Sequence, residues 1–289
     1  MAEVASQIGT VGVVGAGTMG SGIAHVFARY GFRVLLCDVD RNALVSALLR
    51  IRSNLSREAA NGKLTEAEIA SALSRIADTV DRETLSAADF VIEAASERFE
   101  LKAEIFASLD RILPAHAILA TNTSSISITR LAAQTSRPPQ VIGMHFFNPV
   151  PVMPLVEIVR GLATSDAAFE TVHALALKLG KTPIAVNDAP GFVSNRVLMP
   201  MINEAAFAVM EGAATPEAVD QVFKLGMAHP MGPLTLADFI GLDVCVDILR
   251  VLQEGFGDPK YRPCPLLVRM VDAGWLGRKS GRGFYTYEK

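Results

Sequence analysis

Apolar residues follow two kinds of spacing over the first two thirds of the chain. Short runs rich in valine, isoleucine and leucine predict buried strands at residues 8–14, 33–37, 90–94, 117–122, 141–146, 155–159 and 182–186. Segments with helical spacing predict helices at residues 19–30, 41–60, 66–74, 99–112 and 169–179. This alternation predicts an α/β fold, a Rossmann-type and mostly parallel sheet with helices on both faces.

The pattern changes after Asn187, where apolar residues keep helical spacing and no further strand is predicted. Long apolar helices are predicted at residues 193–210 and 234–254. We therefore predict a Rossmann-type domain over residues 1–187 and an all-α domain over residues 188–289. Because these helices are too apolar to bury only one face, we expect them to pack between subunits.

The composition fits a protein with a large buried core and more than one domain. The chain has 289 residues, of which 50% are hydrophobic and 20% are charged. Its formal net charge is −3, and lysine and arginine form no dense run. That balance argues against nucleic acid as a partner.

The cysteines and the first residues bear on the compartment. Cys37, Cys245 and Cys264 are far apart and lack metal-ligand spacing, so they predict neither a disulfide framework nor a metal site. Residues 1–10 lack a basic segment followed by an apolar run, and glycines interrupt the apolar stretch that follows. We therefore expect no signal peptide, no membrane span and a cytoplasmic protein.

A glycine motif between the first strand and the first helix predicts a dinucleotide site. Gly15 permits a tight turn, Gly17 lets the backbone approach a pyrophosphate, and Gly20 lets the helix pack on the strand. Asp38 ends the next strand, where a carboxylate accepts hydrogen bonds from ribose hydroxyls and repels a 2′-phosphate. Asp38 therefore favours NAD, although Arg41 nearby leaves room for NADP.

A histidine and a glutamate lie on two neighbouring apolar strands. His145 lies near the end of residues 141–146, and Glu157 lies inside residues 155–159. A short turn between these strands could bring the two side chains together. Histidine titrates near neutral pH and can take the proton that leaves an alcohol during hydride transfer. The alternative is a hydrogen-bonded core histidine and a glutamate that faces water from an edge strand.

Two further polar groups are candidates for contacts with the substrate. Residues 121–125 (TNTSS) follow a predicted strand at its carboxyl end, where ligands bind in such sheets. The same hydroxyls could instead cap a helix over residues 126–133. Asn195 begins the second domain and is equally consistent with a substrate contact or a buried structural amide.

Taken in order along the chain, the motifs resemble the L-3-hydroxyacyl-CoA dehydrogenases, with the bacterial 3-hydroxybutyryl-CoA dehydrogenases as the nearest members. The resemblance covers nearly the whole length. It is carried by residues 14–20 (VGAGTMG), 121–125 (TNTSS), 144–149 (MHFFNP), 190–196 (PGFVSNR) and 277–285 (GRKSGRGFY).

The resemblance implies a catalytic set. His145 is implied as the acid/base and Glu157 as its partner. Ser124 and Asn195 are implied at the 3-oxygen and thioester region of the substrate.

The resemblance also implies cofactor contacts. Glu97 and Lys102 are implied beside the nicotinamide half of NAD, with Asn148 near them. From the residues alone, Glu97 and Lys102 would read as an ordinary solvated start of a helix. Thr18 and Met19 of the glycine motif complete the predicted NAD-binding residues.

For CoA, the resemblance suggests a helical hairpin in the first domain. Arg57 and Lys63 are candidates for the CoA phosphates, although a solvated helix face explains them nearly as well. The resemblance also suggests a homodimer through the helical domain.

The implied reaction is NAD-dependent oxidation of a (S)-3-hydroxyacyl-CoA, with 3-hydroxybutyryl-CoA as the expected substrate. It would place the protein in fatty acid metabolism, as a β-oxidation enzyme. The alternatives are a related dehydrogenase of a free hydroxy acid, such as gulonate or carnitine, and a non-catalytic NAD-binding protein.

Overall fold

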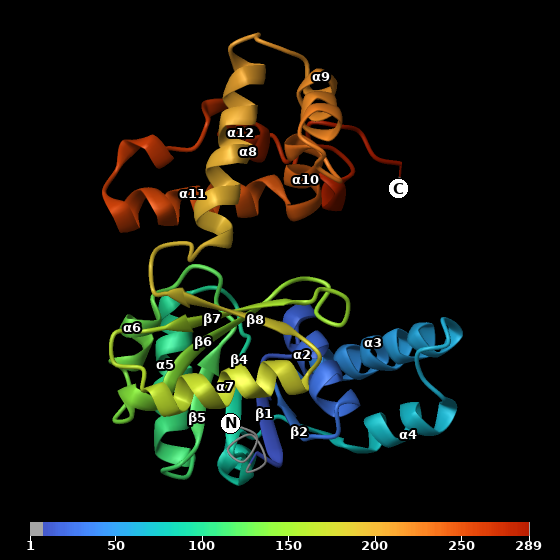
Figure 1. Cartoon of the computed structure of the whole chain (residues 1–289), viewed down its shortest axis with the longest axis vertical. Helices are drawn as coiled ribbons and strands as arrows, with labels where there is room; N and C mark the ends of the chain where they lie inside the picture. Colours follow the sequence, from blue (N-terminus) through green and yellow to red (C-terminus); the bar gives the residue numbers. More distant parts are fainter. Residues whose placement is uncertain (1–7, 289) are drawn as a thin grey trace. The chain divides into compact units, whose positions relative to one another are not determined.

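The computed structural model describes residues 8–288, which form two compact units (Figure 1). The first unit ends at Asp188 and the second begins at Ala189, one residue beyond the predicted boundary. Most of the segment 1–10, over which no leader is predicted, lies outside the described residues. Among the described helices, none combines the length and the apolar character that a membrane span requires.

In the described residues, the first unit is built on one eight-stranded sheet. Its strand order is β3-β2-β1-β4-β5-β6-β7-β8, and only β6 and β7 pair antiparallel. The strands are β1 (Thr10–Val14), β2 (Arg33–Cys37), β3 (Ile76–Thr79), β4 (Phe90–Glu93), β5 (Ile118–Thr121), β6 (Val141–Phe146), β7 (Leu155–Arg160) and β8 (Thr182–Asn187). The prediction of a mostly parallel Rossmann-type sheet is confirmed.

The order of the sheet locates the crevice. The chain runs outward from β1 to β2 and β3, and then returns to β4 on the other side of β1. Ligands bind to open α/β sheets at the carboxyl ends of the strands, where the order reverses in this way. The crevice therefore lies beyond the ends of β1 and β4.

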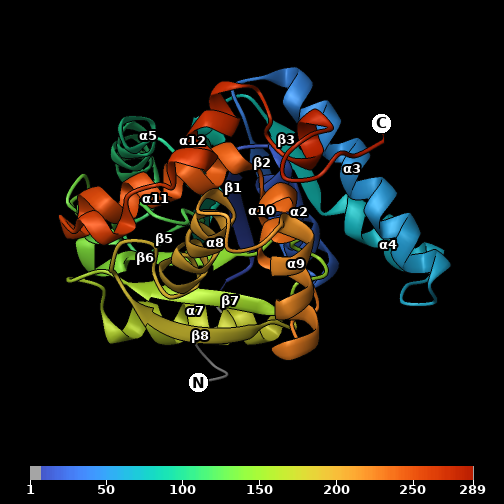
Figure 2. The same ribbon diagram turned by 90° about the horizontal axis from the view of Figure 1, so that it is seen from above.

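Six helices of the first unit cover the sheet or extend from it in the described residues. They are α2 (Thr18–Arg29), α3 (Arg41–Ala60), α4 (Glu66–Ser74), α5 (Phe99–Ile112), α6 (Ile128–Ala132) and α7 (Asp166–Lys178). Helix α7 packs along β7 and β8, at the opposite end of the sheet from α3 and α4 (Figures 1 and 2).

Helices α3 and α4 form the helical hairpin that the resemblance suggested. Asn61 ends α3, and Gly62 has a φ of 71°, a left-handed conformation that glycine adopts without strain. Thr65 begins α4 with a capping box, in which its side chain and that of Glu68 bond each other's backbone N–H groups.

In the described residues, the second unit contains helices and two isolated β-bridges but no strand. Its helices are α8 (Ser194–Met210), α9 (Pro216–Gln221), α10 (Pro233–Ile240), α11 (Leu242–Phe256) and α12 (Pro265–Asp272). The single helix predicted over residues 234–254 is wrong. Gly241, with a φ of 107°, ends α10 and starts α11, because this conformation cannot continue a helix.

Candidate active site

The glycine motif forms the turn between β1 and α2 at the predicted crevice. Gly15 has a φ of 101°, and a Cβ built there would lie 2.7 Å from the carbonyl oxygen of Ala94. A Cβ at Gly20 would lie 1.8 Å from the carbonyl oxygen of Gly15. At Gly17, by contrast, no described atom beyond the adjoining chain lies within 4 Å of the Cβ position. The first and third glycines are thus required by the fold, while the second leaves open space.

The start of α2 is suited to an anion. It begins with Thr18 and Met19, and its first turn holds no acidic residue. No side chain in the described residues caps this end, so its N–H groups and the positive end of the helix dipole remain available to phosphate.

Asp38 is bonded to the same turn. Its Oδ2 accepts a hydrogen bond from the backbone N–H of Ala16 (2.6 Å), and its Oδ1 accepts one from that of Asp40 (2.9 Å). Arg41 is the residue that leaves room for NADP in the sequence. Its Nη1 donates a hydrogen bond to Oδ2 of Asp78 (2.8 Å). The fixed carboxylate beside the glycine turn fits a ribose diol better than a 2′-phosphate.

His145 and Glu157 are directly opposite each other on the antiparallel strands β6 and β7. Nδ1 of His145 lies 2.8 Å from Oε2 of Glu157, and the two residues are 8% and 3% exposed. The prediction that the short turn brings them together is confirmed. The competing interpretation, with Glu157 facing water, is wrong because β8 pairs with β7 on its other side and Glu157 is buried.

Glu97 organises the loop that follows β5. Its Oε1 accepts hydrogen bonds from the hydroxyl of Thr123 and from the backbone N–H groups of Ser124 (2.8 Å) and Ser125 (3.2 Å). Burial alone would raise the pKa of Glu97, but Lys102 and these donors outweigh it and hold the pKa below its usual value. Glu97 is therefore an ionised anchor of this loop, and its side chain remains 38% exposed.

The interpretation in which hydroxyls of residues 121–125 cap the helix that follows is wrong, because the capping residue lies beyond them. Ser127 caps α6 by accepting from the N–H of Arg130 (3.2 Å), and the helix spans fewer residues than predicted. Both the N–H and the hydroxyl of Ser124 instead contact Glu97, the hydroxyl at 3.3 Å. Ser124 is therefore not the cap.

Lys102 lies behind Glu97, in the interior. It is 1% exposed, and its Nζ lies 2.7 and 2.9 Å from the two carboxylate oxygens of Glu93. The same nitrogen lies 3.4 Å from Oε2 of Glu97. The ammonium is thus enclosed by protein groups, so we expect it to orient Glu97 instead of touching a cofactor itself.

Sequence reasoning missed Glu93. This carboxylate ends β4, is fully buried, and also accepts a hydrogen bond from the hydroxyl of Thr121 (2.7 Å). The available signal was an acidic residue at the end of an apolar run, because a buried charge of that kind needs a partner.

The remaining candidates are dispersed. Asn148 is exposed in the turn after β6, and Arg57 and Lys63 are exposed where α3 ends and the hairpin turns. Asn195 belongs to the second unit, in the first turn of α8, and is 9% exposed. Over residues 8–288, no group of three or more histidines, cysteines or acidic residues is placed to hold a metal.

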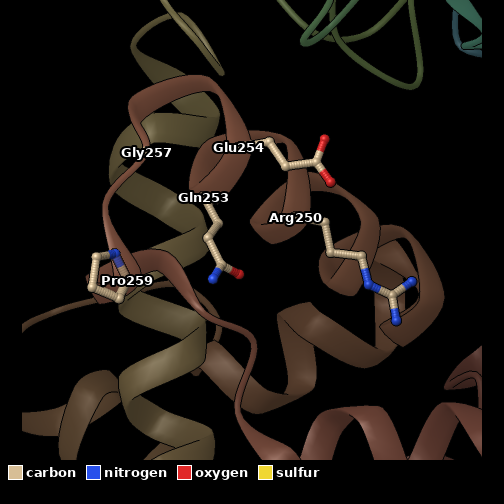
Figure 3. Close-up of a pocket in the computed structure, with 5 residues that line it drawn as sticks. All are labelled: Arg250, Gln253, Glu254, Gly257 and Pro259. Carbon is tan, nitrogen blue, oxygen red and sulfur yellow. The ribbon is translucent and has the colours of Figure 1, made fainter.

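A surface pocket in the second unit contains none of these candidates. It has a volume of about 430 Å³, lies at the end of α11 and is lined by Arg250, Gln253, Glu254, Gly257 and Pro259 (Figure 3). Nothing in its lining bears on the chemistry of the first unit.

Comparison with known proteins decides the family. Residues 10–189 match the family model described as 3-hydroxyacyl-CoA dehydrogenase, NAD binding domain. Residues 191–287 match the model described as 3-hydroxyacyl-CoA dehydrogenase, C-terminal domain. The chain belongs to the 3-hydroxyacyl-CoA dehydrogenase family.

Relatives of this 3-hydroxyacyl-CoA dehydrogenase are similar over almost their whole length. A probable 3-hydroxybutyryl-CoA dehydrogenase of Bacillus subtilis is 59% identical over 98% of this chain and 99% of its own. A 3-hydroxybutyryl-CoA dehydrogenase of Bradyrhizobium diazoefficiens is 54% identical over 98% of this chain and 97% of its own. The crystal structure of (S)-3-hydroxybutyryl-CoA dehydrogenase from Ralstonia eutropha is 53% identical, with a TM-score of 0.95 over 98% of this chain and all of that one.

These matches confirm the resemblance drawn from the sequence motifs. The 3-hydroxyacyl-CoA dehydrogenase described here is an enzyme, an oxidoreductase, and its cofactor is NAD. The non-catalytic alternative is not supported.

Proposed function

We propose that the chain catalyses the reversible, NAD-dependent oxidation of (S)-3-hydroxybutyryl-CoA to acetoacetyl-CoA. The observation that carries this proposal is the buried His145–Glu157 pair, with 2.8 Å between Nδ1 and Oε2, in the same sheet as the glycine turn. The names of the close relatives support the acyl chain, and the family supports the thioester.

In this mechanism, His145 takes the proton of the 3-hydroxyl as the C3 hydrogen leaves. NAD supplies the acceptor for that hydrogen as hydride. Glu157 holds Nδ1, which leaves Nε2 as the nitrogen that exchanges the proton, and its charge stabilises the imidazolium that forms. In the reverse direction, the imidazolium protonates the new alkoxide.

Glu97 and the loop after β5 position the substrate. By anchoring residues 123–125, Glu97 fixes the hydroxyl of Ser124, which we assign to the 3-oxygen of the substrate. Asn148 and Glu97 are assigned to the nicotinamide half of the cofactor, with Lys102 orienting Glu97 from behind. A preorganised donor of this kind stabilises developing charge without reorganising during the reaction.

We assign the other half of NAD to the glycine turn. Gly15, Gly17 and Gly20, with Thr18 and Met19, form the turn and helix start that would hold the pyrophosphate, and Asp38 would bind the ribose.

The second unit and the hairpin complete the proposal. Residues 1–187 would act as the NAD-binding domain, and residues 188–289 as the substrate and dimerisation domain. Asn195 is assigned to the thioester region, and Arg57 and Lys63 to the CoA phosphates. A homodimer, a cytoplasmic location and a step of fatty acid β-oxidation agree with this assignment.

The substrate is tested by loss of NADH absorbance with acetoacetyl-CoA and, separately, with free acetoacetate. We expect kcat/KM for the thioester to exceed that for the free acid by at least about 100-fold, because CoA contributes binding energy that the free acid lacks. Preference for free acetoacetate, or turnover of neither compound, would reject the proposed function.

Glu157→Gln is expected to lower kcat by about 10- to 100-fold and to change the pH dependence of the reaction. The neutral amide no longer stabilises the imidazolium that forms as His145 takes the proton of the alcohol. Glu170→Gln, at an exposed carboxylate on α7, serves as the control. A Glu157→Gln profile that superimposes on the parent would exclude coupling between Glu157 and His145.

A further inference from the structure

A buried lysine outside the proposed catalytic set holds the turn that joins β6 to β7. Lys181 directly precedes β8 and is 7% exposed. Its Nζ donates hydrogen bonds to the carbonyl oxygens of Val150 (2.5 Å) and Met153 (2.8 Å). No ion pair joins Lys181 to a carboxylate in the part of the chain that the structure describes. The ammonium therefore has the carbonyl groups of one turn as its hydrogen-bond acceptors.

Burial of a cation of this kind reduces the stability of the fold. Burial lowers the pKa of Lys181, and the nearby charge of Arg29 lowers it further, while Glu58 partly offsets both. An unbranched apolar side chain would fill a similar volume without this desolvation. Unlike such a side chain, the ammonium donates two hydrogen bonds, and these hold two separate carbonyl groups close to the same nitrogen.

Backbone hydrogen bonds hold the turn at further points, although several of its residues, such as Val152, are exposed. The N–H groups of Val152 and Met153 donate to the carbonyl of Pro149 (2.9 and 3.0 Å), and Thr182 next to the lysine donates to the carbonyl of Pro154 (2.7 Å). On the opposite side the turn packs against the dinucleotide helix α2.

Val150 makes that contact with α2. It is 2% exposed, and a Cβ built on Gly22 of α2 would lie 2.9 Å from the Cβ of Val150. The turn is thus packed between α2 and the start of β8. Lys181 provides its polar attachment on the β8 side.

We propose that Lys181 is a positioning residue for hydride transfer. By fixing the turn 147–154, it sets the place of Asn148 and the ends of the two strands that hold His145 opposite Glu157. This inference rests on the proposed function, in which Asn148 faces the cofactor. A misplacement of about 1 Å in reacting groups costs roughly 100-fold in rate, so a loosened turn should be measurable.

The test replaces Lys181 by methionine, which keeps the volume and removes the ammonium. We expect kcat for acetoacetyl-CoA reduction to fall by about 10- to 100-fold and the NADH dissociation constant to rise by about 3- to 10-fold. KM for acetoacetyl-CoA should stay within about threefold of the parent, because the turn is not assigned to CoA. Lys181→Arg, which keeps the donors, should recover part of kcat.

Lys178→Met is the matched control, because Lys178 is exposed in the last turn of α7, three residues before Lys181. It should leave kcat and NADH affinity at the parental values. A folded Lys181→Met protein with parental kcat and NADH affinity would overturn the proposal, even if its melting temperature changed. If the methionine variant does not fold, Lys181→Gln is measured against the same two constants and the same criterion.

The two proposals fail in different ways. A parent protein that does not reduce acetoacetyl-CoA would reject the proposed function. The NADH dissociation constant of Lys181→Met would still show whether the turn depends on the ammonium, and an unchanged value would reject the role of Lys181.

Discussion

Replacing His145 by glutamine is expected to abolish turnover of acetoacetyl-CoA while NADH binding is retained. Glutamine can occupy a similar space and donate a hydrogen bond to Glu157, but it cannot exchange a proton near neutral pH. General acid–base catalysis contributes about 10²- to 10⁴-fold, so we expect kcat to fall by at least about 10³-fold, or about 4 kcal/mol. NADH absorbance measures turnover, and NADH fluorescence titration measures binding.

His116→Gln is the control for the His145 variant. His116 is an exposed histidine whose Nε2 lies 3.5 Å from Oδ1 of Asp89. Its replacement removes an imidazole that has no role in the proposed mechanism. It should keep the parental kcat. A His145→Gln enzyme within about threefold of the parental rate would show that the reaction does not use this imidazole.

Gly20→Ala and Gly17→Ala are expected to have different effects. The first should lower the stability of the protein, and the second should weaken its binding of NADH. At Gly20 the new Cβ would lie 1.8 Å from the backbone oxygen of Gly15, so α2 or the turn must move. We expect Gly20→Ala to lose about 3 kcal/mol or more in the free energy of unfolding. Urea denaturation followed by circular dichroism measures this loss.

Gly17→Ala should fold like the parent, because no described atom beyond the adjoining chain lies within 4 Å of its Cβ position. The methyl group would instead occupy the space assigned to the pyrophosphate. We expect the NADH dissociation constant to rise by about 100-fold, equal to about 2.7 kcal/mol. Parental NADH affinity in Gly17→Ala would place the pyrophosphate elsewhere.

The sequence was informative where a pattern is local. Apolar runs located β6 and β7, and the short turn between them indicated that His145 and Glu157 could meet. The glycine spacing anticipated the turn before α2. In each case the deciding contacts lie within one element or across one short turn.

The sequence was less informative where the fold joins distant segments. Strand β3 has four residues, one of them Asp78, and is defined by its pairing with β2 more than by any apolar run. The apolar spacing continues across Gly241. The sequence therefore did not indicate the break between α10 and α11.

The partners of two buried lysines could not be identified from the sequence. Lys102 meets Glu93, nine residues before it, because the loop 94–98 brings the start of α5 beside the end of β4, and no motif in the sequence predicts the path of that loop. Lys181 follows a glycine that ends a helix, and in the sequence it resembles an ordinary surface lysine. The two carbonyl groups that it binds are 28 and 31 residues away along the chain.

The central claim is that hydride passes between the nicotinamide and C3 of an acyl-CoA thioester while His145 moves the proton. Its most direct test is reduction of acetoacetyl-CoA with NADH that carries deuterium at both hydrogen positions of nicotinamide C4, followed by mass spectrometry and chiral analysis of the product. We predict one deuterium at C3 of (S)-3-hydroxybutyryl-CoA with the parent enzyme and no labelled product with His145→Gln. A thioester product without deuterium at C3, or equal labelling by the His145→Gln enzyme, would contradict the claim.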